Sequence, residues 1–276
     1  MLVPMEHLGT SRSAAFFDLD KTIIARSSTL AFSRPFYAGG LINRRTVLRS
    51  AYAQFVYLLG GADHDMMEKM REYLSAMCTG WDVQTVREIV ADTLHHIVEP
   101  MIYDEAVALI AEHHAAGRDV VIVSSSGAEV VEPIGAMLGA DKVIATRMVV
   151  ADGKYTGEIS VYAYGPHKAT AITELAAAEG YDLLASYAYS DSITDEPMLA
   201  AVGHPFAVNP DKALRRLAVS RDWPVLDFSK PVALEERKRL REVRRPAVAA
   251  SLAGVVLAAA GVLLYAARRR ARPAGS

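Results

Sequence analysis

The chain has 276 residues, of which 51% are hydrophobic and 22% are charged, and its formal net charge is -2. Such a chain can bury a substantial core, and its charge balance lacks a general nucleic-acid-binding signature, so no nucleic acid is expected as a partner. The single cysteine, Cys78, excludes an internal disulfide. A reducing compartment is the simple inference.

The first predicted strand leads into Phe16-Phe17-Asp18-Leu19-Asp20-Lys21-Thr22, where two acids stand one residue apart. Residues two apart share one face of a strand, so Asp18 and Asp20 can both point at one site. Two like charges so close need a cation or a proton between them. The alternative is that both acids only cap a turn and open the next helix.

The stretch from about residue 27 to residue 100 carries apolar residues at helical spacing and few strand-like runs. This pattern predicts an inserted helical domain, although the helices could instead belong to the main core. The neighbouring pairs His95-His96 and His113-His114 cannot chelate a metal together, because adjacent helical residues face different ways. We interpret these histidines as surface or packing residues.

A short β-branched strand, Asp119-Val120-Val121-Ile122-Val123, precedes Ser124-Ser125-Ser126-Gly127, which is predicted to be a hydroxyl-rich loop before a helix. Further on, Asp152-Gly153 predicts a hairpin turn between two short strands, and the hairpin is expected to project beside the active site. Other predicted elements are helices near 104–116 and 129–138 and strands around 143–150 and 155–162.

Lys168 opens a helix after Gly165-Pro166-His167, and a later apolar strand ends in Ser190-Asp191-Ser192-Ile193-Thr194-Asp195. Taken alone, this lysine would be a solvated surface residue. In an open parallel sheet, however, loops at the carboxyl ends of the strands gather in one crevice. The chain therefore brings an acid pair, a hydroxyl, a lysine and a second acid pair to one region.

That order of residue types resembles the four signature motifs of the haloacid dehalogenase (HAD) superfamily, and most closely its phosphoserine phosphatase-like branch (subfamily IB). The likeness covers roughly residues 14 to 215. It implies an α/β fold, a Rossmann-like doubly wound parallel sheet, with an inserted α-helical cap that closes over the crevice. The expected boundaries are 14–26 and 101–228 for the catalytic core, 27–100 for the cap, 229–246 for a charged stalk and 247–267 for a transmembrane helix.

Phosphate monoesters resist hydrolysis because water must approach an anion, so a fixed carboxylate nucleophile that splits the reaction into two steps is an advantage. Asp18 is the predicted nucleophile, forming an aspartyl-phosphate. Asp20 is predicted to protonate the leaving oxygen and then to deprotonate the attacking water. The resemblance implies the same roles, with the backbone carbonyl of Asp20 also on the metal.

Mg²⁺ is the predicted cofactor, because a hard divalent cation suits an all-oxygen cluster. Its expected side-chain ligands are Asp18 and Asp191. Asp195 is expected to act through water or by orienting its neighbours, with helix capping near Pro197 as the alternative.

Charge that builds on the phosphoryl oxygens is expected to be stabilised by Lys168, by the Ser124 hydroxyl and by backbone N–H groups near Asp20 and Ser125. Thr22 is expected to shape its loop rather than to touch substrate. Alone, Ser124 would be interpreted as a helix cap.

Residues 247–267 carry no charge and almost no polarity, and as a helix they would span about 32 Å, close to the ~30 Å hydrocarbon core. This predicts a single-pass C-terminal membrane anchor; the alternative is an alanine-rich helix on the soluble domain or at the interface. No apolar signal segment is visible in residues 1–13. A cytoplasmic catalytic domain is therefore expected.

Together these features predict a Mg²⁺-dependent phosphomonoester phosphatase with a phosphorylated small-molecule or lipid-linked substrate. The alternatives are a phosphotransferase or mutase of the same chemistry and a non-catalytic, membrane-tethered phosphate-binding module. In phosphoserine phosphatases of the branch, a glutamate shortly after the first motif recognises the substrate amine. Ser27 stands roughly there, beside Arg26, which makes an anionic or lipid-linked phosphate as plausible as phosphoserine.

Overall fold

The computed structural model describes residues 12–42 and 75–229. All of them belong to the first of two units into which the chain divides, Met1–Val232 and Ala233–Ser276. In the described part of the chain no helix is both long and apolar enough to cross a membrane. The predicted membrane helix, 247–267, and most of the predicted stalk lie outside the described residues.

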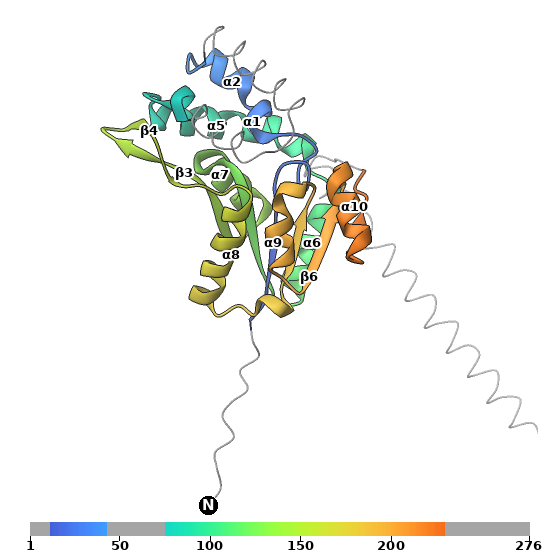
Figure 1. The fold of residues 1–276 in the computed structure, drawn as a ribbon. Coiled ribbons are helices and arrows are strands. Elements are labelled where there is room, and N and C mark those ends of the chain that lie inside the picture. Colours follow the sequence, from blue (N-terminus) through green and yellow to red (C-terminus); the bar gives the residue numbers. More distant parts are fainter. Residues whose placement is uncertain (1–11, 43–74, 230–276) are drawn as a thin grey trace, which may run out of the picture. The chain divides into compact units, whose positions relative to one another are not determined.

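A seven-stranded sheet forms the centre of this unit, in the order β4-β3-β2-β1-β5-β6-β7 (Figure 1). Neighbouring strands are parallel except for the antiparallel pair β3 and β4. This confirms the predicted α/β class with a mainly parallel sheet. The strands are β1 (Ala14–Phe17), β2 (Asp119–Gly127), β3 (Lys142–Ala151), β4 (Lys154–Val161), β5 (Tyr187–Ser190), β6 (His204–Val208) and β7 (Val225–Leu226).

The central strand β1 is buried along its whole length, because helices cover both faces of the sheet. Phe16 packs on one face with residues of α8, α9 and α10, including Ile172 and Leu199. Phe17 faces the opposite layer, where its ring lies 5.8 Å from His113 of α6. The core helices are α6 (Asp104–Ala115), α7 (Ala128–Leu138), α8 (Pro166–Glu179), α9 (Glu196–Ala200) and α10 (Lys212–Ser220).

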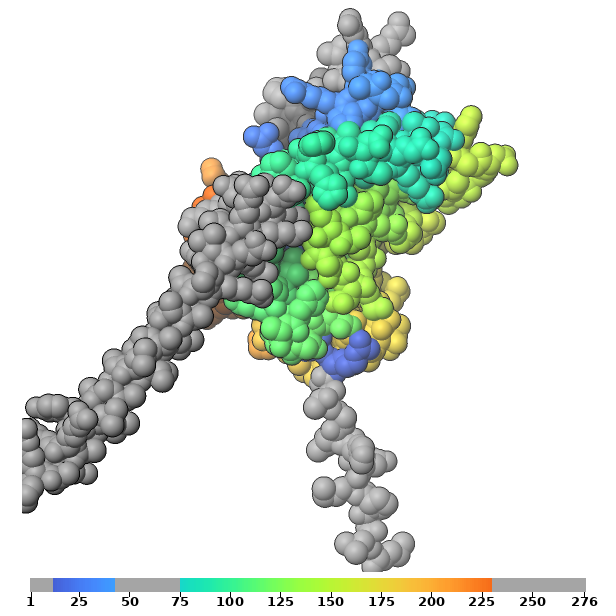
Figure 2. All heavy atoms as spheres, turned by 180° about the vertical axis from the view of Figure 1, so that it is seen from behind, coloured from blue at the N-terminus to red at the C-terminus, as the bar shows by residue number. Residues whose placement is uncertain are grey.

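Most of the described residues of the predicted cap, 27–42 and 75–100, are helical. They form α1 (Ser28–Ala31), α2 (Ser33–Ala38) and α5 (Val83–Ile97), with the short turn η1 (Glu99–Met101) after them. Asp82 is the N-cap of α5, and its side chain accepts a hydrogen bond from the backbone N–H of Thr85. Figure 2 shows α5, in cyan, lying across the light-green residues of α7.

The β3–β4 hairpin turns at Asp152 and Gly153, whose φ angles of 49° and 76° are those of the predicted tight turn. The hairpin also contacts the cap segment. The backbone N–H of Gly80 donates to the Tyr155 carbonyl over 2.8 Å, and that of Val83 donates to the Gly153 carbonyl over 2.9 Å. One hairpin thus joins the sheet to the cap.

Ser124-Ser125-Ser126-Gly127 is not the loop predicted from the sequence, because β2 continues through Gly127. The pairing of β2 with β3 shifts register between Ser124 and Gly127, where Ser124 lies opposite Ala145 and Gly127 opposite Thr146. Ser124 and Gly127 both still pair with β3, and this pairing keeps the polar run extended. The shift leaves Ser125 exposed between two buried serines.

Candidate active site

The loop after β1 carries the first two predicted site residues. The backbone N–H of Asp18 donates to the Tyr189 carbonyl over 2.9 Å, so Asp18 stands at the end of the central strand next to β5. The chain then turns through Lys21, whose φ is 63°, and the N–H of Ile23 bonds back to the Leu19 carbonyl. Leu19 and Ile23 are fully buried, and this anchors the loop.

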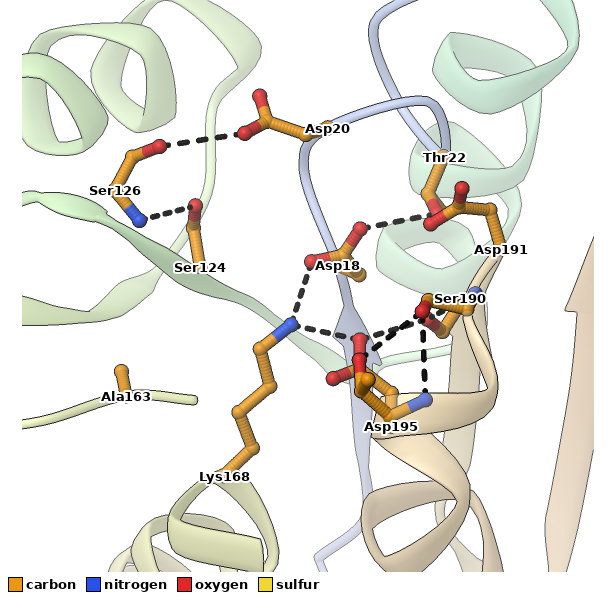
Figure 3. Close-up of polar contacts among 12 residues, drawn as sticks. Asp18, Asp20, Thr22, Ser124, Ser126, Ala163, Lys168, Ser190, Asp191 and Asp195 are labelled. Atoms are coloured by element: carbon orange, nitrogen blue, oxygen red, sulfur yellow. Dashed lines mark hydrogen bonds and ion pairs between the residues drawn. The ribbon is translucent and has the colours of Figure 1, made fainter. Parts of the chain in front are cut away.

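Lys168 lies between two carboxylates that come from distant parts of the sequence (Figure 3). Its Nζ atom is 2.6 Å from Asp18 Oδ1 and 2.7 Å from Asp195 Oδ2. The lysine is only 2% exposed, so it is not the solvated surface residue that its place at a helix start would indicate alone. The helix start of α8 delivers this cation to the carboxyl ends of β1 and β5.

Asp195 has its carboxylate directed into the same cluster. Its Oδ2 atom also accepts a hydrogen bond of 2.7 Å from the hydroxyl of Ser190, the last residue of β5. Although Asp195 occupies the N-cap position of α9, its side chain makes no cap hydrogen bond. The Asp195 carboxylate therefore contacts Lys168 and Ser190, and it does not cap α9.

The protonation of this cluster depends on opposing effects. Burial raises the pKa of Asp18 and the charge of Lys168 opposes the rise; the net result is a pKa of about 8. For Lys168, burial lowers the pKa, but the charges of Asp18 and Asp195 outweigh burial and raise it. The raised pKa of Asp18 favours a neutral acid, whereas the raised pKa of Lys168 favours a charged pair. Because the contact of 2.6 Å has the length of a charge-assisted hydrogen bond, we assign the ion pair.

Asp191 adds a third buried carboxylate, and burial raises its pKa to about 7. The exposed Lys21 places its Nζ atom 3.9 Å from Asp191 Oδ2. Asp18 and Asp195 pair with the one buried lysine and Asp191 has only the exposed Lys21 nearby, so the cluster carries excess negative charge on oxygen atoms. Among the described residues no group of three or more His, Cys, Asp or Glu side chains is placed to hold a metal ion. A cation at Asp18 and Asp191 would therefore have to be one that takes few carboxylates and keeps several waters, as Mg²⁺ does. Thr22 donates to Asp18 Oδ2 over 3.2 Å.

Asp20 lies on the side of the cluster that faces the cap. Its carboxylate accepts hydrogen bonds from the Ser28 backbone N–H over 2.7 Å and from the Ser126 hydroxyl over 3.3 Å. Burial raises the pKa of Asp20, and these two donors oppose the rise. Figure 3 shows Asp20 directed toward Ser126 and away from Lys168.

The predicted phosphate-binding serines differ in exposure. Ser124 is 1% exposed, and its hydroxyl accepts a hydrogen bond of 3.2 Å from the Ser126 backbone N–H. Ser125 is exposed and lines a cavity between the cap and the core. Figure 3 shows Ser124 on the same side of the cluster as Ser126.

Three residues in the cluster carried no predicted role. Ser126 and Ser190 lie inside the signature segments, so their position in the sequence could have indicated that they are close to the site. Ser28 stands at the start of the cap, and no pattern links it to Asp20. Its contact could be found only from the folded chain.

Comparisons with known proteins agree with the sequence resemblance. Residues 15–200 match the family model of the haloacid dehalogenase-like hydrolases. The chain is 66% identical, over 99% of its own length and 100% of the relative's, to an inhibition of morphological differentiation protein of Streptomyces azureus. It is 60% identical to a probable phosphatase of Mycobacterium tuberculosis, over 94% of this chain and 90% of that one. A phosphoserine phosphatase of the same organism is 34% identical over 94% and 82% of the two chains.

Solved structures show the same fold. A protein with unknown function from Bordetella pertussis Tohama I matches with a TM-score of 0.71 at 28% identity, covering 79% of this chain and 99% of that one. A phospho-aspartyl intermediate analogue of phosphoserine phosphatase matches with a TM-score of 0.57 at 20% identity, covering 86% and 99%. The fold, the order of the four polar segments and these relatives lead to one conclusion: the chain belongs to the haloacid dehalogenase-like hydrolase family and is a phosphatase.

Proposed function

We propose that this phosphatase is Mg²⁺-dependent, that it hydrolyses phosphomonoesters through an aspartyl-phosphate on Asp18, and that its C-terminal segment anchors it to a membrane. The observation that carries the chemistry is the buried Lys168, held between Asp18 and Asp195 at the carboxyl ends of parallel strands. A lysine in that position holds one carboxylate oriented and offers positive charge where a phosphate would bind.

In the first step Asp18 attacks phosphorus, and the bond from phosphorus to the alcohol oxygen breaks. Asp20 gives its proton to that oxygen, and its raised pKa supports a protonated start. In the second step Asp20 takes a proton from water, which attacks the aspartyl-phosphate and frees Asp18 and inorganic phosphate. One acid can serve both steps because the first leaves it in the form that the second requires.

Lys168, the Ser124 hydroxyl and backbone N–H groups near Asp20 and Ser125 are the groups that we propose for stabilising charge on the phosphoryl oxygens. Mg²⁺, when bound by Asp18, Asp191 and the backbone carbonyl of Asp20, would neutralise charge on the carboxylates and on the phosphoryl group. Asp195 orients Lys168 by accepting its hydrogen bond of 2.7 Å, and the Thr22 hydroxyl donates a hydrogen bond to the second oxygen of Asp18.

The proposed substrate is a phosphorylated small molecule or a lipid-linked phosphate. A relative named as a phosphoserine phosphatase supports the small-molecule class. The uncharged sequence of residues 247–267 supports a single-pass anchor, with the catalytic domain in the cytoplasm. If the substrate is membrane-associated, deleting the anchor should lower turnover of lipid phosphates in vesicles.

The test of the chemistry is phosphate release from a panel of phosphomonoesters by the detergent-solubilised protein, with Mg²⁺ or with a chelator. We expect release only with Mg²⁺ and a loss of about a thousandfold or more in Asp18→Asn. Asp92→Asn, at an exposed position on α5, is the matched control. Acid-quenched protein should carry a phosphoryl group on the peptide that contains Asp18. Release that persists in Asp18→Asn would overturn the assignment of the nucleophile.

A further inference from the structure

A cavity of about 150 Å³ lies between the cap and the core, next to Asp20. Ser126, which donates to Asp20 over 3.3 Å, lines the cavity, and so does Thr29, whose hydroxyl lies 3.3 Å from that of Ser126. Because Asp20 is proposed to protonate the leaving oxygen, a group that leaves from phosphorus would enter this cavity.

The walls of this cavity are mostly apolar. Phe36, Trp81 and Val86 contribute from the cap, and Val130, Met148 and Ile159 contribute from the core and the hairpin. A cavity of this volume holds a body of about six carbon atoms, the size of one benzene ring. The bound alcohol is therefore compact and largely apolar next to its phosphate.

One carboxylate, that of Glu129, belongs to the lining, while no lysine, arginine or histidine does among the described residues. Its Oε1 atom lies 4.0 Å from the guanidinium of Arg87, whose side chain is 61% exposed, so water screens that partner. Two other polar residues of the lining, Tyr155 and Cys78, stay neutral. Burial and the charge of Glu129 raise the pKa of Cys78 to about 12. Burial, a hydrogen bond that the Tyr155 hydroxyl donates to Glu129, and the charge of Glu129 raise the pKa of Tyr155.

The carboxylate of Glu129 also lies close to the end of the cavity that adjoins Asp20. A Cβ atom on Gly127 would lie 3.9 Å from Glu129 Oε2, and Gly127 directly follows Ser126. The Glu129 side chain is 16% exposed, and its partners are a neutral tyrosine and a water-screened arginine. A carboxylate placed this way in a mostly apolar lining favours a cation and repels an anion.

We propose that this cavity binds the leaving alcohol of the substrate and that Glu129 selects an alcohol bearing one ammonium group on a compact apolar body. The inference rests on the phosphatase function proposed above. It disfavours leaving groups with a carboxylate or a second phosphate, because the Glu129 carboxylate repels their negative charge.

The test uses three aryl phosphates of nearly one shape: 4-(aminomethyl)phenyl, 4-methylphenyl and 4-carboxyphenyl phosphate. For the full chain we expect kcat/KM to be highest for the ammonium ester and lowest for the carboxylate ester. In Glu129→Gln the ammonium ester should lose about tenfold, the effect of one charge-assisted hydrogen bond, while the methyl ester changes little. Comparing each ester between proteins cancels its intrinsic reactivity.

Glu132→Gln is the matched control, because Glu132 is on the same helix but is half exposed and pairs with Arg147 over 2.6 Å. The control should keep the order of the three esters. Two results would overturn the inference: no preference for the ammonium ester in the wild type, or a preference that survives in Glu129→Gln. If wild-type protein hydrolyses none of the three esters but releases phosphate from another member of the phosphomonoester panel, the inference alone is overturned. Release from no member of the panel would overturn the proposed function.

Discussion

Ser126 links the proposed acid to the cap at the scale of single residues. When Asp20 is ionised, Ser126 donates its one hydroxyl proton to Asp20, and Ser28 is then the donor in the contact of 2.8 Å between the two serine hydroxyls. The Ser28 backbone N–H binds the other oxygen of Asp20. The carboxylate is thereby held from the core strand β2 and from the first residue of cap helix α1 at once.

Ser126→Ala should lower kcat about fivefold for a small ester, because a hydrogen bond to Asp20 worth about 1 kcal/mol is lost. KM should change less than kcat, since Lys168 and the backbone donors for the phosphate remain. Steady-state kinetics of phosphate release measures both. Thr173→Ala, which removes an exposed hydroxyl bonded within α8, is the control. An unchanged kcat in Ser126→Ala would show that this contact does not position Asp20.

His113 was interpreted as a surface or packing residue, and the structure shows a buried histidine with a defined tautomer. Arg118 donates from Nε to His113 Nδ1 over 2.7 Å, so the proton of the neutral ring is on Nε2 and points at the Tyr189 hydroxyl, 2.9 Å away. Burial lowers the pKa of His113 to about 4, and the charge of Arg118 acts in the same direction.

The lowered pKa of His113 makes stability depend on pH. Between about pH 6.5 and pH 4 the unfolded chain binds a proton at this histidine and the folded chain does not, so folding stability falls as pH falls. His113→Gln cannot titrate, and the stability advantage of wild type over this variant should shrink by at most about 1.4 kcal/mol per pH unit. Urea unfolding at pH 7.5 and pH 5 measures it, with exposed His96→Gln as control. A constant difference would contradict the prediction.

At the scale of elements, the β3–β4 hairpin depends on two glycines with different surroundings. Gly153 has a φ of 76° with nothing near its missing Cβ, whereas Gly157 has a φ of 94° and a Cβ there would overlap Thr79 Oγ1. Thr79 belongs to the cap segment next to Gly80, which bonds to the hairpin. Gly157 therefore allows the hairpin and the cap to approach closely.

Alanine substitutions at these glycines should separate backbone strain from steric overlap. We expect Gly153→Ala to lower the free energy of unfolding by about 1 kcal/mol through its left-handed backbone. Gly157→Ala should cost about 2 to 4 kcal/mol, because overlap with Thr79 adds to the strain. Urea unfolding gives both values. When Thr79→Ala is added to Gly157→Ala, the loss in free energy of unfolding should fall toward that of Gly153→Ala. If Gly153→Ala and Gly157→Ala lower the free energy of unfolding equally, the overlap with Thr79 is excluded.

Sequence reasoning predicted the parallel sheet, the hairpin turn and the core helices because apolar runs and turn residues report local structure. It predicted a loop at Ser124–Gly127, because a polar run carries no sign of the neighbouring strand that keeps it extended. The sequence around Lys168 also did not predict its burial, because that burial depends on contacts with Asp18 and Asp195 from other elements. The cluster of four segments was inferred from their order, while the catalytic roles of its members stay predictions.

At the scale of the whole molecule, the strand order explains why distant segments meet. With β1 between β2 and β5, Asp18 and Asp191 directly follow two adjacent strands, Ser124 lies near the carboxyl end of the third, and α8 adds Lys168 from the side. The described chain ends just after β7, where the backbone N–H of Phe228 donates to the side chain of Asn209 over 2.9 Å. Every contact described here is made by residues up to 229.

Deletion of residues 231–276 should therefore separate membrane attachment from catalysis. We expect kcat/KM for a soluble ester to stay within about twofold of wild type, because the deletion removes no described contact of the site. Full-length protein should sediment with lipid vesicles, since burying a segment as long and apolar as 247–267 in lipid is strongly favourable, and the deleted form should stay in the supernatant. Replacing Leu257 and Val262 with arginine in the full chain should weaken sedimentation in the same way, because each buried charge opposes insertion. Sedimentation of the deleted form, or its absence in the full-length protein, would contradict the proposed anchor.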